Sequence, residues 1–189
     1  HLPEDQREQA LGEALRAARE IWDEWGRAEA LVALVPHLSE SLLQEALRAA
    51  REIQSEWGRT QALTALAPYL PESLLREALR AAREIQDEQD RAEALVALAP
   101  HLPESLLREA LRAAREIRNE QGRAKALAAL APHLPESLLR EALRAAREIR
   151  DERGRAKALA ALASHLPEDQ REQALWEALR AAREIRDEW

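Results

Sequence analysis

The stretch HLPESLLREALRAAREI at residues 101–117 recurs unchanged at residues 133–149. Near-copies stand at residues 69–85 and 37–53. The shared motif ALRAAREI begins at residues 14, 46, 78, 110, 142 and 178, so the first four steps measure 32 residues and the last measures 36. A fixed period of about 20–50 residues is typical of solenoids and related arrays. The sequence therefore predicts a single repeat domain over residues 1–189, divided into repeats 1–36, 37–68, 69–100, 101–132 and 133–164 and a partial repeat 165–189.

Each repeat is predicted to form two helices. The longer one, at about residues 103–119, carries a broad apolar stripe of helical period made of Leu106, Leu107, Ala110, Leu111, Ala113, Ala114 and Ile117. Pro103 suits its first position. Gly122 is predicted to end it at positive φ, with Gly26, Gly58, Gly154 and once Asp90 at the equivalent place. A shorter helix follows at about residues 123–131, and Pro132 and Pro135 break it.

One repeat alone has too few large apolar side chains to offset the entropy lost on ordering 32 residues. Neighbouring repeats must therefore supply the missing burial by stacking. We expect an all-α, right-handed solenoid of αα-hairpins with a period of 32 residues. It should contain six long and five short helices, beginning and ending on a long one.

Composition narrows the class of protein. Apolar residues make up 46% and charged residues 33%, as in a folded chain, and no cysteine is present for disulfides, thiolate chemistry or metal binding. We expect a cytoplasmic protein without a membrane span.

Residues 1–94 hold 11 Arg and 19 Asp or Glu, a net charge of −8, whereas the remainder carries +1. This balance argues against nucleic-acid binding. The chain opens at His1 on a repeat boundary, which we interpret as a cut or engineered sequence.

The candidates for chemistry have simpler structural interpretations. A row of five histidines, broken by Tyr69, follows the helix corners at His1, His37, His101, His133 and His165. Packed helices lie about 8–10 Å apart, too far for these side chains to share a metal. The carboxylates Glu109 and Glu116 recur in near-identical surroundings, which do not separate their pKa values as acid–base catalysis requires. No phosphate loop, GxSxG elbow or HExxH helix occurs. We therefore expect no enzyme, no cofactor and no metal.

The repeats differ mainly just after the shared Ile, where the long helix gives way to the short one. The positions that vary there are the candidate partner-binding residues: Trp22, Trp25, Glu29, Gln54, Trp57, Gln61, Gln86, Gln89, Arg118, Gln121, Arg150 and Arg153. Arg186, Trp189, Lys125, Lys157 and the series Val32, Thr64, Val96, Ala128 and Ala160 continue these columns. A fixed core with a variable edge suits a binding repeat. Drift at exposed positions after recent duplication is the competing interpretation.

Tryptophans favour the binding interpretation. Trp22, Trp25 and Trp57 gather in the first repeats, and exposed aromatic side chains often mark interaction surfaces. The alternative is that they pack beneath a loop. Trp176 and Trp189 belong to the incomplete last repeat, whose apolar side we expect to be open. End-to-end association of copies, or closure into a ring, would cover that side.

The unit RAKALAALAPHLPESLLREALRAAREIRDERG resembles the helical-hairpin repeats of bacterial α-solenoids, which often accompany signalling ATPase modules of the NACHT type. Its layout is similar to tetratricopeptide and HEAT repeats, although the period is 32 rather than 34 and the Trp–Leu–Gly–Tyr spacing is missing. No family binding residue can therefore be carried over. The near-identical copies also resemble an engineered or consensus-derived array. The resemblance implies a non-catalytic scaffold that binds a protein or peptide. The alternative is a purely structural or designed array without a natural ligand.

Overall fold

The computed structural model describes residues 3–185, and these residues form eleven α-helices with no strand among them. Six helices stand at the positions of the predicted longer ones: α1 (Glu4–Glu20), α3 (Glu40–Glu52), α5 (Glu72–Arg83), α7 (Glu104–Glu116), α9 (Glu136–Arg147) and α11 (Glu168–Glu184). Five alternate with them: α2 (Glu24–Leu34), α4 (Glu56–Leu66), α6 (Glu88–Leu98), α8 (Glu120–Leu130) and α10 (Glu152–Ala163). Two of the first six, α5 and α9, have 12 residues and are no longer than α10. The all-α class, the number of helices and the 32-residue hairpin period are confirmed.

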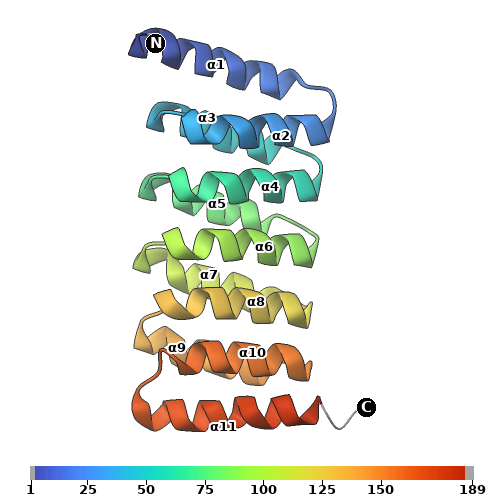
Figure 1. Cartoon of the computed structure of the whole chain (residues 1–189), viewed down its shortest axis with the longest axis vertical. Helices are drawn as coiled ribbons and strands as arrows, with labels where there is room; N and C mark the ends of the chain where they lie inside the picture. The colour runs from blue at the N-terminus through green and yellow to red at the C-terminus, as the bar shows by residue number, and fades with distance from the viewer. Residues whose placement is uncertain (1–2, 186–189) are drawn as a thin grey trace. The chain divides into compact units, whose positions relative to one another are not determined.

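The chain divides into two compact units, with the boundary in the sequence between His101 and Leu102. Unit 1 contains α1–α6, and unit 2 contains α7–α11. Within unit 1, α2, α4 and α6 pack side by side in one layer, with α3 and α5 behind them (Figure 1). Within unit 2, α8 and α10 pack in the same way, and α11 lies along α10. The single domain predicted for the whole chain stays a prediction.

The predicted apolar stripe forms the core. Its seven members in the α7 hairpin are all buried, from Leu106 to Ile117. On the second helix of that hairpin, Leu127 and Leu130 are fully buried, and the small buried side chains of Ala124 and Ala126 let neighbouring helices approach closely. The corner that follows each even-numbered helix in the first four hairpins is a 3-10 turn: η1 (Val35–His37), η2 (Ala67–Tyr69), η3 (Ala99–His101) and η4 (Ala131–His133).

The helix boundaries differ from the prediction by up to three residues. Helix α7 starts at Glu104 with Pro103 as its N-cap, so the proline precedes the first helical position. It ends at Glu116, because Ile117 already adopts extended backbone angles (φ −69°, ψ 120°). The second helix starts at Glu120, three residues earlier than expected. The turn between the two helices is therefore only a few residues long.

The predicted role of the glycines at this turn is wrong. No described residue has positive φ, and Gly26, Gly58, Gly122 and Gly154 lie in the first turn of the following helix. The same correction applies to Asp90, which lies in the first turn of α6. Close approach explains the small residue: a Cβ on Gly58 would lie 3.0 Å from Ile53 Cγ2 and 3.3 Å from the Ala28 Cβ of the preceding hairpin.

A side-chain cap fixes each of these turns. Asn119 Oδ1 accepts a hydrogen bond from the Gly122 N–H at 2.7 Å, as an N-cap residue does. The other four turns repeat this bond, using the side chains of Asp23, Ser55, Asp87 and Asp151 as acceptors. The cap leaves the residue before it, such as Arg118, exposed at the hairpin tip.

A hairpin also holds the turn of the hairpin that follows it. In unit 2, Glu120 Oε2 of one hairpin accepts the Asp151 N–H of the next at 2.6 Å. Within that next hairpin, the Arg155 guanidinium donates to the Ile149 carbonyl at 2.9 Å. In unit 1, the Glu56 carboxylate accepts the N–H groups of Gln86 and Asp87 at 2.8 and 2.6 Å. The turns that carry the variable residues are therefore fixed by a cap within their own hairpin and by a carboxylate of the preceding hairpin.

Candidate functional site

The predicted candidates gather at the hairpin tips and in the first turns of the even-numbered helices. Those just before a helix are Trp22, Gln54, Gln86, Arg118 and Arg150; those on its second residue are Trp25, Trp57, Gln89, Gln121 and Arg153; Glu29 and Gln61 lie about one turn further on. All are exposed except Gln61, which is half-buried. Arg186 and Trp189 lie outside the described residues.

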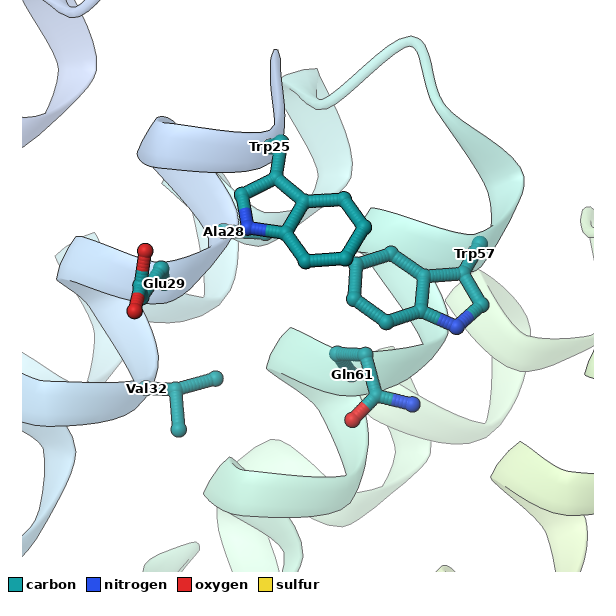
Figure 2. Close-up of a pocket in the computed structure, with 6 residues that line it drawn as sticks. All are labelled: Trp25, Ala28, Glu29, Val32, Trp57 and Gln61. Atoms are coloured by element: carbon teal, nitrogen blue, oxygen red, sulfur yellow. The ribbon is translucent and has the colours of Figure 1, made fainter. Parts of the chain in front are cut away.

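Two of the predicted tryptophans form a pair. Trp25 of α2 and Trp57 of α4 stack with ring centroids 4.5 Å apart and ring planes inclined by 20°. Figure 2 shows the two rings pointing toward one another across the space between the helices. The exposed fractions are 60% for Trp25 and 41% for Trp57, so neither ring is covered by a loop. Trp22 is 92% exposed and does not line the space beside this pair.

The stacked rings form one end of a shallow groove between α2 and α4. The groove encloses about 200 Å³ and is lined by Trp25, Ala28, Glu29, Val32, Trp57 and Gln61 (Figure 2). Pockets for drug-sized ligands measure about 300–1,000 Å³. This groove therefore has room for one side chain of a longer partner rather than for a whole cofactor. Its polar groups, the Glu29 carboxylate and the Gln61 amide, flank the apolar centre.

An equivalent groove in unit 2 has a different lining. It lies between α8 and α10, encloses about 210 Å³ and is lined by Gln121, Ala124, Lys125, Asp151, Arg153, Gly154 and Lys157. Position by position, Gln121 and Arg153 stand where unit 1 has its two tryptophans, and the two lysines replace Glu29 and Gln61. Arg118 and Arg150 add exposed positive charge at the neighbouring hairpin tips. The groove of unit 2 is basic, whereas that of unit 1 is aromatic with one carboxylate.

The candidate binding residues predicted from the sequence did not include several groove-lining residues. Ala28 and Val32 contribute the apolar floor in unit 1, and Lys125 and Lys157 contribute the charge in unit 2. Three of them could have been predicted from the sequence, because Val32 and both lysines stand at positions that vary between repeats. Ala28 is buried and gave no such signal.

Asp90 sits among these columns, at the place where the other hairpins have glycine. Burial raises the pKa of its carboxyl group, and the nearby charges of Asp87, Glu93 and Glu56 raise that pKa further. The ionised carboxylate therefore destabilises the folded chain at neutral pH. This penalty disappears as the pH falls below about 3.8, where the carboxyl group is protonated in the unfolded chain as well.

Replacing Asp90 with Asn should therefore raise the free energy of unfolding at pH 7 by roughly 0.5 kcal/mol, the scale of like-charge pairs on helices. Urea denaturation at pH 7 and pH 3 measures this, and the gain should vanish at the lower pH. Asp169→Asn on the exposed first turn of α11 is the control and should bring no gain. A gain that is equal at both pH values would contradict the electrostatic cause.

The corner histidines do not form a metal site in the described part of the chain. His37, His101 and His133 each end a 3-10 turn, and His165 follows α10. Among residues 3–185, no group of three or more His, Asp or Glu side chains is arranged to hold a metal ion. None of the helices in this range combines the length and apolar character needed to cross a membrane.

No family model matches the chain, and no curated protein matches it. One solved structure, a de novo designed 16-helix transmembrane nanopore, aligns at 22% identity with a TM-score of 0.24. The alignment covers 97% of this chain and 64% of that chain. A score this low carries no argument about the fold or its use.

Proposed function

We propose that the chain is a non-catalytic repeat scaffold that binds a protein or peptide segment along the exposed edge of its even-numbered helices. In this proposal the hairpins form a right-handed solenoid, and the edge is part of a curved surface. The observation that carries the proposal is the exposed Trp25–Trp57 stack, which lines a groove of side-chain size. Solvent-exposed indoles are among the side chains that contribute most to protein interfaces.

The groove of unit 1 suits a long side chain with a positive end. The alkyl stem of an Arg or Lys can lie on the indole rings, where a cation is attracted to the ring face. The Glu29 carboxylate lines the same groove and supplies the opposite charge. Residues 1–94 carry a net charge of −8, which also favours a basic partner by attracting it over longer distances. The partner we propose is therefore a basic segment with an apolar or aromatic flank.

A second candidate is an array whose repeats serve a structural purpose and bind no ligand. The observation that favours it is the near identity of residues 101–132 and 133–164, which differ only at Asn119/Asp151, Gln121/Arg153 and Pro132/Ser164. Two of these differences lie at the turn where the grooves form. Duplication followed by drift at exposed positions would leave the same pattern.

Binding of defined peptides tests the proposal. The probes are twelve-residue peptides that combine Arg or Lys with Leu or Trp, and each is compared with a copy in which Glu replaces the basic residues. Fluorescence anisotropy of labelled peptides should show binding of basic probes only. Trp57→Ala should weaken the binding by tenfold or more, as expected for a central interface tryptophan. Its ring is partly exposed, so circular dichroism should show a folded chain.

Trp22→Ala is the matched control, because it removes an exposed tryptophan outside the groove. The control should leave affinity within about twofold of the original chain. Equal losses in the two variants would show that the groove is not the binding site. Failure of every basic probe to bind would favour the structural array.

A further inference from the structure

Helix α11 exposes leucines that the interior hairpins bury. Leu175 and Leu179 are 48% and 42% exposed, and Trp176 between them is 61% exposed. Their counterparts in the shared motif on α7 are Leu107 and Leu111, both of which are buried. The position of Trp176 is held by Arg in α7 and α9 and by Gly12 in α1. The last helix thus carries an apolar surface with an added aromatic residue.

This surface is a single stripe on the outer side of α11. The helix contacts α10 through its other side, where Ala174, Ala178 and Ala181 are buried. At 100° per residue, the side chains of Glu172, Leu175, Trp176, Leu179 and Arg183 fall within about 100° of the helix circumference. We call these five residues the α11 stripe. It faces away from the buried alanines and has an apolar centre with one charge at each end.

The order of charges makes the stripe complementary to itself. Glu172 lies toward the N-terminal end and Arg183 toward the C-terminal end, at nearly equal distances from the centre. Two copies of the stripe in antiparallel orientation would place each Glu172 opposite the Arg183 of the other copy. Both side chains are exposed, and neither forms an ion pair with another described residue. The leucines and Trp176 would then meet at the centre.

The hairpins of unit 2 already use this type of charge pair between neighbouring helices. Arg115 pairs with Glu141 at 2.6 Å, and Arg147 pairs with Glu177 at 2.7 Å. The Arg147 guanidinium donates to the Glu177 carboxylate, and this hydrogen bond lowers the pKa of Glu177. Arg183 occupies the position of Arg115 and Arg147 in the shared motif but has no such partner among the described residues.

We propose that the α11 stripe binds the same stripe of a second copy, in an antiparallel two-fold dimer. An isologous contact of this kind closes on itself and does not continue into a filament or ring. The buried area of one helix pair is small for a stable dimer, so the association should be weak and should depend on concentration. Docking of Arg183 against Glu13 of α1 in a second copy would instead produce head-to-tail chains, and the test separates the two arrangements.

Sedimentation equilibrium of the 189-residue chain over a wide concentration range tests the proposal. The original chain should show a monomer–dimer equilibrium without larger species. Glu172→Arg and Arg183→Glu each replace two attractive contacts with two repulsive ones, and each should weaken dimerisation about tenfold or more. An equimolar mixture of the two variants should dimerise again, because the mixed dimer has opposite charges at both contacts.

Arg76→Glu on the exposed surface of α5 is the control and should leave dimerisation unchanged. Circular dichroism should show that all variants retain the helix content of the original chain. A chain that remains monomeric at every concentration would overturn the proposal. So would an unchanged dimer in Glu172→Arg, or failure of the two charge variants to restore association when mixed. Trp57→Ala lies outside the stripe and should not affect the dimer, so the result is independent of the proposed peptide site.

Discussion

Replacing Leu111 with Ala is expected to lower the free energy of unfolding by about 2–5 kcal/mol. Its side chain is fully buried in unit 2, in a core made otherwise of leucine, isoleucine and alanine. Truncation removes the transfer energy of the lost methyl groups and leaves a cavity that the packed helices can close only in part. Urea denaturation followed by circular dichroism measures the loss.

The repeat supplies a matched control at Leu179, which holds the same place in the shared motif on α11. Its side chain is 42% exposed, so Leu179→Ala should cost less than about 1 kcal/mol. The measurement should be made at low protein concentration, where association through α11 does not contribute. Equal losses at the two positions would contradict the difference in burial described for the two helices.

Replacing Glu120 with Ala should lower the free energy of unfolding at pH 7 by roughly 1–2 kcal/mol. Its carboxylate accepts the Asp151 N–H, and removing it leaves this N–H of the next hairpin without its partner. Partial burial raises the pKa of Glu120. This effect is outweighed by hydrogen bonds from the backbone of Asp151 and Arg150 and by the charges of Arg123 and Arg150. The pKa of Glu120 therefore lies below its ordinary value.

The lowered pKa fixes the sign of the pH dependence. The contribution of Glu120 is present above the unfolded-state value of about 4.5 and is lost as the pH falls through the lower folded-state value. The difference between the original chain and Glu120→Ala should therefore shrink in acid. Glu104→Ala is the control, because Glu104 is also the first residue of its helix but is exposed. A loss at Glu104 as large as that at Glu120 would show a general helix-dipole effect.

The repeat period and the apolar stripe were sufficient to predict the helical hairpins. The leucines and alanines from Leu106 to Ile117 follow helical spacing, and burial confirms each of them. The sequence did not fix the role of the glycine at the turn, because a glycine after a long helix fits either the end of that helix or the start of the next. The varying residues three positions before it, such as Asp23, Ser55 and Asn119, are all good N-cap residues. This N-cap pattern indicates that the next helix starts just before the glycine.

The candidate site was predictable in its location but not in its shape. The varying columns identified the hairpin tips, and nearly all of their residues are exposed. Stacking of Trp25 on Trp57 depends on the distance between two helices from successive hairpins, which spacing along one helix does not fix. The contribution of Ala28 to the groove floor depends on the same distance.

The hydrogen bonds between successive turns of unit 1 run in one direction along the chain. Glu24 accepts the backbone N–H of Gln54 in the following hairpin, and Glu56 accepts those of Gln86 and Asp87 in the hairpin after that. Local opening of an early hairpin in unit 1 therefore removes acceptors from the next turn, whereas opening of a later one leaves the earlier turns intact. Amide hydrogen exchange in this unit should consequently be asymmetric, with slower exchange at a turn whose preceding hairpin is closed.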